Sequence, residues 1–188
     1  MRTRFLHLVR HGHYDAEPER LTALGRSQAD LLAQRLARYP IDAVISSTMP
    51  RAKETAARIH LQVPDARASA KVCLRENMPS PPRRRPPPDH YLALSDTKRQ
   101  AMADRLERAW ELFGKPPLRT ERHDVLVCHG NVIRAMVCRA LELGPGVWDD
   151  ITCPSHCSLT TLQVRAGGAR LVRLNETGHL PSDMVTVG

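Results

Sequence analysis

The spacing of hydrophobic residues changes repeatedly along the chain, from short continuous runs to runs with a helical period. A dense apolar run such as Phe5 to Val9, which only His7 interrupts, is typical of a strand that is buried on both faces of a sheet. Runs of this kind predict strands at 3–10, 41–46, 72–74 and 125–128, and a closing hairpin at 158–164 and 169–175 that turns across Gly167 and Gly168.

Between these runs, apolar residues recur at the three- and four-residue spacing of one helix face. The spacing predicts helices at 22–38, 51–60, 96–114 and 131–141. Thr22 and Asp96 are residue types that cap the first turn of a helix, and Gly114 is a residue type that ends one. By contrast, the six prolines within 79–88 remove backbone donors, so we expect irregular chain there.

Strands that alternate with helices predict an α/β fold. We expect three layers, α/β/α, in which a mostly parallel central sheet carries helices on both faces. The length fits a single domain over 1–188, with a Pro/Arg-rich loop at about 77–95. Ligands of such sheets bind beyond the carboxyl ends of the strands, so polar residues at those ends are candidates for a functional site.

Composition and charge exclude several classes of protein. No run of 18 apolar residues is present to span a membrane, and the first residues lack the apolar core of a secretory signal, so we expect a cytoplasmic location. The net charge of +8 favours an anionic partner, but two Trp, three Tyr and two Phe offer little surface for stacking bases, so nucleic acid is not expected. Five cysteines, an odd number, argue against a disulfide scaffold.

Charged and polar side chains follow four of the predicted strands, and together they suit phosphoryl transfer. A neutral imidazole can act as nucleophile, guanidinium groups bind phosphate oxygens, and a carboxylic acid can protonate the leaving oxygen. Glycines next to helix N-termini let backbone amides approach a phosphate. Because fixed cations can meet the developing charge, we expect neither a metal nor a cofactor. The candidates are Arg10, His11, Gly12, Arg51, Glu76, His129 and Gly130.

Six stretches in this order resemble the histidine phosphatase superfamily, whose fold is phosphoglycerate-mutase-like. They are LVRHGHY at 8–14, LTALGRSQA at 21–29, SSTMPRAKETA at 46–56, LREN at 74–77, VCHGNVIRAMVCRAL at 127–141 and NETGHLPSDMVT at 175–186. The last two stretches are most similar to the serine/threonine-protein phosphatase branch of the superfamily.

The resemblance implies a role for each matching residue. His11 would be the nucleophile that becomes phosphohistidine, and Glu76 would be the proton donor. Arg10, Arg51 and His129 would bind the phosphate, with His129 either cationic or donating.

Residues around this set complete the expected site. Gly12 and Gly130 would help to bind the phosphate, and Asn131 and Ser158 would line the pocket. Tyr14-Asp15-Ala16-Glu17 stands where other subgroups often carry an asparagine that contacts phosphate, so the sequence departs from the family pattern there.

The expected activity is that of a metal-independent phosphomonoesterase acting on a phosphorylated substrate. The loop from Gly12 to Thr22 is short, and a shallow site of this kind would admit phosphoserine or phosphothreonine in a protein segment. It would also lack the enclosure that a mutase needs, which ranks phosphatase above mutase. A phosphatase or mutase for small metabolites, and a non-catalytic phosphate-binding or scaffold module, stay open as alternatives.

Three further features carry weaker hypotheses. Metal sites are conceivable at Cys153-Pro-Ser-His156-Cys157 and at His11-x-His13, but neither offers a full ligand set, and Cys157 is expected to be an inert thiol. The run Arg83-Arg84-Arg85 could recruit acidic or phosphorylated segments. The tail from Leu180 to Val187 could dock on a neighbouring copy, which would make a homodimer, or it could be mobile.

Overall fold

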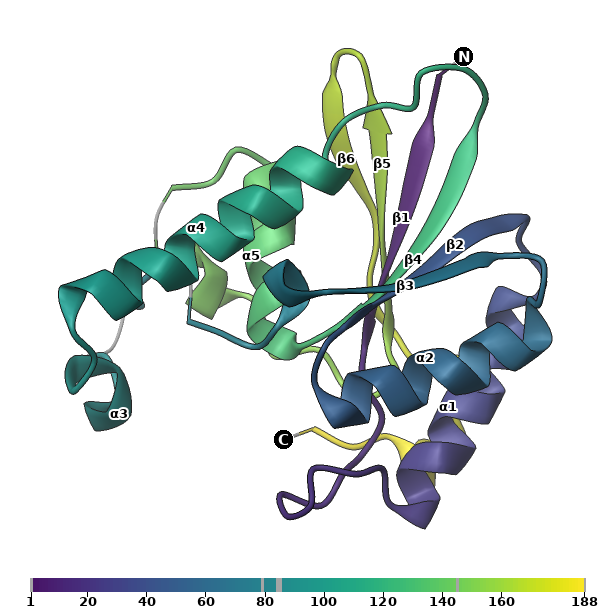
Figure 1. Ribbon diagram of the computed structural model, residues 1–188, viewed down its shortest axis with the longest axis horizontal. Helices are drawn as coiled ribbons and strands as arrows, with labels where there is room; N and C mark the ends of the chain where they lie inside the picture. The colour runs from purple at the N-terminus through teal and green to yellow at the C-terminus, as the bar shows by residue number, and fades with distance from the viewer. Residues whose placement is uncertain (1, 79, 84–85, 145, 188) are drawn as a thin grey trace.

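The computed structural model, which describes residues 2–78, 80–83, 86–144 and 146–187, contains a six-stranded mixed sheet (Figure 1). Strands β1 to β4 are mutually parallel, β5 is antiparallel to β1, and β6 is antiparallel to β5. The sheet order is β3-β2-β4-β1-β5-β6. The strands are β1 (Arg4–Arg10), β2 (Ile41–Ser47), β3 (Arg67–Lys71), β4 (Arg122–Cys128), β5 (Leu159–Arg165) and β6 (Gly168–Glu176).

Helices cover both faces of this sheet, which confirms the expected three-layer architecture (Figure 1). α1 (Ala23–Leu36) and α2 (Pro50–Gln62) pack on one face, and α4 (Asp96–Phe113) and α5 (Gly130–Ala140) on the other. The short elements are α3 (Asp89–Leu92) and the 3-10 turns η1 (Val72–Leu74), η2 (Val147–Asp150) and η3 (Ser182–Met184). Within the described ranges, none of the helices combines the length and hydrophobicity that a membrane span requires.

Two apolar cores form because successive residues of a strand face opposite sides of the sheet. Leu6 and Leu8 of β1 join the core beneath α4 and α5, whereas Val9 joins the core beneath α1 and α2. Each central strand is therefore hydrophobic on both faces, which explains the continuous apolar runs in the sequence.

The predicted strand at 72–74 is wrong. The third strand is β3, at Arg67–Lys71, and residues 72–74 form the turn η1. β3 is an edge strand whose five residues are all exposed, so no apolar run marks it. Cys73 and Leu74 are hydrophobic because the turn buries them in the core.

The caps of two helices give a mixed outcome. Thr22 caps α1 as predicted, since its side chain accepts a hydrogen bond from the backbone N–H of Gly25 at 3.0 Å. The fourth helix is capped by Ser95, not by Asp96, because the Ser95 hydroxyl accepts from the N–H of Lys98 at 3.3 Å. Asp96 instead lies in the first turn, where its charge complements the helix dipole.

The register of the parallel strands brings their carboxyl ends to one edge of the sheet. Arg10 of β1 pairs with Cys128 of β4, and Ser46 of β2 pairs with Val127 of β4. Residues that directly follow β1, β2 and β4 are therefore neighbours in space, as the sequence argument requires.

The proline-rich segment is held against η2. The Ser80 side chain accepts hydrogen bonds from the N–H of Gly146 at 3.1 Å and from Trp148 Nε1 at 3.2 Å. Arg83 forms an ion pair with Asp150, so this guanidinium is committed to its own chain. Arg84 and Arg85 lie outside the described residues, and recruitment by the arginine run stays a prediction.

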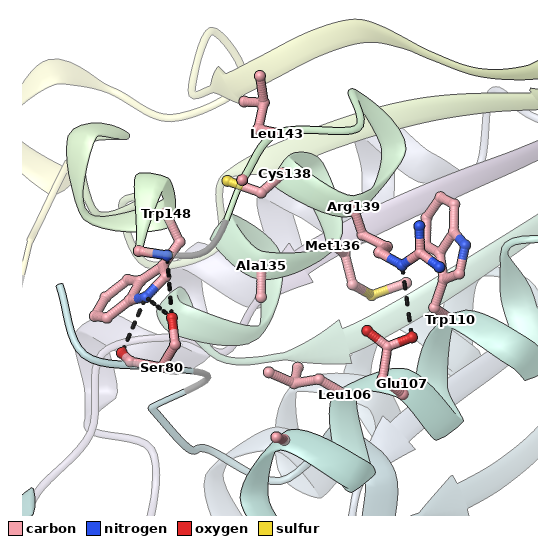
Figure 2. A pocket seen from close by; sticks show the side chains of 13 residues that line it. Ser80, Leu106, Glu107, Trp110, Ala135, Met136, Cys138, Arg139, Leu143 and Trp148 are labelled. Atoms are coloured by element: carbon pink, nitrogen blue, oxygen red, sulfur yellow. Dashed lines mark hydrogen bonds and ion pairs between the residues drawn. The ribbon is translucent and has the colours of Figure 1, made fainter. Parts of the chain in front are cut away.

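Ser80 and Trp148 also line an apolar groove of about 260 Å³ between α4 and α5 (Figure 2). Trp110 and Trp148 line it, and an ion pair joins Arg139 to Glu107 at 3.5 Å beside it. None of the residues predicted for phosphoryl transfer lines this groove.

The C-terminal tail packs on its own chain. The Gln28 side chain donates to the carbonyl of Met184 at 2.7 Å and to Thr186 Oγ1 at 2.9 Å, and Leu180 is buried. These contacts fix the tail beside α1 within the monomer. A homodimer stays a prediction.

His7 is a polar side chain buried within the sheet. Its Nε2 lies 3.1 Å from Nδ1 of His123, and its Nδ1 lies 3.3 Å from Oγ1 of Thr161. Burial, with a further contribution from His123, lowers the pKa of His7 to about 3.

We expect acid to destabilise the fold through this group. Between pH 6.5 and about 3 the unfolded chain binds a proton at residue 7 that the folded chain does not, so the free energy of unfolding falls as the pH decreases through that window. In urea titrations followed by circular dichroism, His7→Leu should reduce the pH slope by up to about 1.4 kcal/mol per pH unit. His60→Gln, on α2, is the control. Equal slopes in wild type and His7→Leu would contradict the assignment.

Candidate active site

His11 follows β1 directly and is 2% exposed. Its Nδ1 lies 2.9 Å from the carbonyl of Gly12, and its Nε2 lies 3.1 Å from Nε of Arg51. Arginine can only donate and a carbonyl can only accept, so the proton of the neutral ring is on Nδ1. Nε2 therefore carries a lone pair directed at the guanidinium.

Several causes keep this imidazole neutral. Burial lowers the pKa of His11 well below its ordinary value, and His129, Arg51 and Arg10 lower it further. The hydrogen bond to Gly12 opposes this shift but does not reverse it. A neutral imidazole with an available lone pair is the form that a nucleophile requires.

The Arg51 guanidinium lies at the centre of the cluster, in the first turn of α2. NH1 pairs with the Glu19 carboxylate at 2.9 Å, and NH2 lies 3.4 Å from Nδ1 of His129. The guanidinium carbon also lies 4.5 Å from the ring centroid of Tyr14, within the range of a cation–π contact. Tyr14 thus packs on a phosphate-binding candidate at the position where the sequence departs from the family pattern.

His129 is completely buried and faces Arg51 through Nδ1. Because that nitrogen accepts, the proton lies on Nε2 and is donated to Ser47 Oγ at 2.9 Å. Burial, then Arg51 and Arg10, lower the pKa of His129 to about 3. Of the two forms expected from sequence, the neutral one is therefore favoured in the structure, and Ser47 fixes its orientation.

Arg10 is the last residue of β1, and it is buried. Its NH1 donates to the carbonyl of Pro154 at 2.7 Å. Gly130 lets the Cys153 side chain lie close to the first turn of α5, because a Cβ at position 130 would be 2.7 Å from Cys153 Sγ. Arg10 contributes positive charge at both His11 and Glu76.

Glu76 follows η1 and is half-buried. Its carboxylate accepts from the N–H of Asn77 at 3.0 Å and from the backbone of Asn131. Burial outweighs these bonds and the nearby arginines, and it raises the pKa of Glu76 to about 7. The Asn131 side chain turns away to accept from Arg134 at 3.0 Å, so Asn131 reaches the cluster through its backbone.

The remaining predicted residues are structural neighbours of this cluster. Gly12 is pressed against the start of α1, where an added Cβ would lie 2.6 Å from the carbonyl oxygen of Gly25. Its N–H donates to Thr55 Oγ1 at 3.1 Å and is therefore already bonded. Ser158 is fully buried at the start of β5, and its hydroxyl has no hydrogen-bond partner among the described residues.

The structure thus brings the five titratable candidates, which are Arg10, His11, Arg51, Glu76 and His129, to one edge of the sheet. Their catalytic roles stay predictions. Sequence reasoning did not assign Ser47, Glu19 or His156 to this site. Ser47 had a signal, since it directly follows the second predicted strand, but Glu19 and His156 contact residues that are distant in the chain.

Neither predicted metal alternative forms a ligand set. Across the described part of the chain, no group of three or more His, Cys, Asp or Glu side chains could hold a metal ion. The Nδ1 of His13 lies 2.9 Å from Thr22 Oγ1, and the Nδ1 of His156 lies 2.9 Å from Thr186 Oγ1. Cys157 is fully buried, which raises the pKa of its thiol and favours the inert form.

Known proteins are similar to this chain over nearly its whole length. The family model for the Histidine phosphatase superfamily (branch 1) matches residues 6–177. The serine/threonine-protein phosphatase PGAM5, mitochondrial, of Xenopus laevis is 35% identical and covers 98% of this chain and 69% of its own length. Its Caenorhabditis elegans namesake is 38% identical, with corresponding shares of 98% and 66%.

Solved structures give the same result for the fold. Phosphoglycerate mutase from Plasmodium falciparum superimposes with a TM-score of 0.67 and 29% identity, covering all of both chains. Bacillus stearothermophilus YhfR gives a TM-score of 0.73 at 20% identity, covering 94% of this chain and 98% of its own. The phosphoglycerate-mutase-like fold expected from the sequence is therefore confirmed.

The ion pair between Glu19 and Arg51 should compete with any anion that binds this guanidinium. Glu19 is 40% exposed, so breaking its ion pair should cost little free energy. Its backbone has a left-handed φ of 61°, which is unfavourable for a residue other than glycine, so the backbone should also move at low cost. Glu19→Gln should lower KM for a small aryl phosphate by about two- to fivefold, the range expected for an exposed ion pair. Glu17→Gln removes the same charge from an exposed position of the same loop and should leave KM unchanged. A KM that rises in Glu19→Gln would show that the carboxylate assists binding.

Proposed function

This chain belongs to the histidine phosphatase superfamily (branch 1) and is a histidine phosphatase, and from that premise we propose that it dephosphorylates phosphoserine or phosphothreonine in protein segments through a phosphohistidine at His11. The observation that carries the proposal is the tautomer of His11, whose Nε2 lone pair faces a buried guanidinium. A carboxyl with a pKa near 7 lies within the same charged cluster.

The first half of the reaction transfers the phosphoryl group to His11. The phosphate binds between Arg10 and Arg51, and its oxygens replace the contact between Arg51 Nε and His11 Nε2. Nε2 then attacks phosphorus while the bond to the serine or threonine oxygen breaks. Glu76, protonated near neutral pH, gives its proton to that leaving oxygen.

The second half regenerates the enzyme. Glu76, now a carboxylate, accepts a proton from water as the water oxygen attacks phosphorus. The bond between phosphorus and Nε2 breaks, and inorganic phosphate leaves with His11 neutral again. The hydrogen bond from Nδ1 to the Gly12 carbonyl holds the same tautomer throughout.

His129 and Ser47 support the transferred group. A phosphoryl dianion beside Nδ1 favours the uptake of a proton from solvent there, and the ring then donates to a phosphoryl oxygen while Nε2 stays bonded to Ser47. Fixed donors aimed at developing charge are the main source of catalysis in such transfers. The charge is met by protein groups alone, and the proposal contains no metal.

The choice of protein substrates rests on two supports. This chain spans about two thirds of the length of the Xenopus laevis and Caenorhabditis elegans relatives, and both are named serine/threonine-protein phosphatases. The segment between β1 and α1, which borders Arg51 through Glu19, is short and exposed over Asp15 to Pro18. A cytoplasmic location stays a prediction, since the names of those relatives include the word mitochondrial.

The mechanism is tested by looking for a phosphoryl group covalently bound to His11. Rapid quenching of the protein with a phosphoserine peptide, followed by mass spectrometry, should find phosphate on the His11 peptide of the wild type. His11→Ala should show none and should retain less than about one thousandth of kcat. A chelator should leave the rate unchanged, and His60→Ala is the control. Turnover that persists in His11→Ala would refute the mechanism. Turnover of metabolite phosphates but not of phosphopeptides would refute the substrate class alone.

The role of Glu76 predicts that kcat/KM falls at high pH and that the effect of losing the carboxyl depends on the leaving group of the substrate. Because its pKa is about 7, the proton that it donates is lost as the pH rises above 7, and kcat/KM for a phosphoserine peptide should fall there. Glu76→Gln should lower kcat/KM for that peptide by about 10²–10⁴-fold and remove the fall at high pH. With 4-nitrophenyl phosphate, whose leaving group needs no proton, the loss in kcat/KM, which reports transfer to His11, should be much smaller. Equal losses in kcat/KM with both substrates would contradict the assignment.

A further inference from the structure

His156 lies beside the reacting imidazole, but the mechanism above does not use it. Its ring centroid is 5.5 Å from that of His11 and 5.5 Å from that of His13, and the Tyr14 ring lies 6.4 Å away. The residue is 3% exposed. A third imidazole thus packs into the cluster from the loop that precedes β5.

This loop is held in place by backbone hydrogen bonds from several directions. The N–H of Cys157 donates to the carbonyl of Arg10 at 3.0 Å, which ties the loop to the end of β1. The N–H of Ser155 donates to Asn175 Oδ1 at 2.7 Å, and the N–H of His156 donates to the carbonyl of Thr186 at 2.9 Å. The position of the His156 ring is therefore set before any substrate binds.

One ring nitrogen is bonded and the other is not. Nδ1 lies 2.9 Å from Thr186 Oγ1 in the C-terminal tail. Nε2 is on the opposite side of the ring, and none of the described residues offers it a hydrogen bond although it is buried. A buried polar atom without a partner is costly and rare, so one at a functional site points to a ligand that supplies the partner.

The charges around this ring identify the ligand as an anion. Burial first, and then Arg10, His13 and Arg51, disfavour a proton on His156, while the Thr186 backbone favours one. Each of these opposing charges would be offset by a phosphoryl group bound between the two guanidinium groups. The ring is thus neutral without an anion and suited to protonation when an anion binds.

We propose that His156 is a further phosphoryl-binding residue, whose Nε2 donates a hydrogen bond to an oxygen of the bound phosphoryl group. The proposal rests on the proposed function of the same site. The ligand enters as a phosphate monoanion, and its proton moves from a phosphoryl oxygen to Nε2. The resulting imidazolium and dianion form a charge-assisted hydrogen bond, and no further reactant is needed. Thr186 is the positioning residue that orients the ring.

The test measures binding of inorganic phosphate to the full chain by calorimetry at pH 6.5. His156→Phe keeps a ring but no donor, and it should weaken binding by roughly tenfold or more. His156→Gln places an amide nitrogen near the position of Nε2 and should restore most of the affinity. His156→Asn reaches only the position of Nδ1 and should not. His60→Phe, on α2, should bind as the wild type does.

Kinetics with 4-nitrophenyl phosphate separate binding from packing. If the inference holds, His156→Phe raises KM by about the same factor as the phosphate dissociation constant and changes kcat less. Equal weakening in the Phe and Gln variants, or none in either, would overturn it. If His156→Phe does not fold, Thr186→Val decides, since it keeps the imidazole but removes the hydroxyl that orients it, and it should weaken phosphate binding severalfold. Unchanged binding in that variant would then overturn the inference.

These outcomes are separate from those of the proposed function. Phosphate binding that depends on His156, in a protein that forms no phosphohistidine, would support the inference and refute the mechanism. Turnover through a phosphohistidine at His11, with phosphate binding that does not depend on His156, would support the mechanism and overturn the inference.

Discussion

The structure depends on the burial of two guanidinium groups beside three imidazoles at one edge of the sheet. Burial removes water from Arg10 and Arg51, so their charges act strongly on neighbours. The first effect is on the imidazoles: with burial as the main cause, the pKa values of His11, His129 and His156 are all lowered, which keeps every ring neutral. The site therefore combines two guanidinium charges that can bind a phosphate with neutral imidazoles whose lone pairs can accept a bond. A phosphoryl acceptor needs this combination.

The same burial acts in the opposite direction on the acid. Glu76 lies in the same field, and the two arginines alone would lower its pKa. Desolvation outweighs them and raises the pKa to about 7, which makes the carboxyl a donor and an acceptor near neutral pH. One physical cause, removal from water, therefore prepares the proposed nucleophile and the proposed acid together. Their roles differ because a charged imidazole is a cation and a charged carboxyl is an anion.

The sequence predicted this edge well because the relevant signals are local. A strand's end is marked by the last residue of an apolar run, and parallel strands bring such ends together, so His11 and His129 could be placed without coordinates. The strand β3 was missed because an exposed edge strand has no apolar run. Contacts such as those of Glu19 with Arg51 and of His156 with Thr186 join residues about 30 positions apart in the chain, which no periodicity encodes.

The C-terminal tail shows why such contacts matter for the site. Thr186 accepts from Gln28 and from the backbone of His156, and Gln28 in turn accepts from the N–H of His13 at 2.8 Å. The tail therefore connects two residues that lie near His11, which are His13 on the loop after β1 and His156 on the loop before β5. Helix α1 supplies the shared side chain, which is fully buried although polar. Each polar atom of this buried glutamine is hydrogen-bonded, and losing any one bond would leave a desolvated group at a cost in free energy. The side chain is therefore held in one position. The geometry around His11 is thus set from both ends of the chain as well as by the sheet.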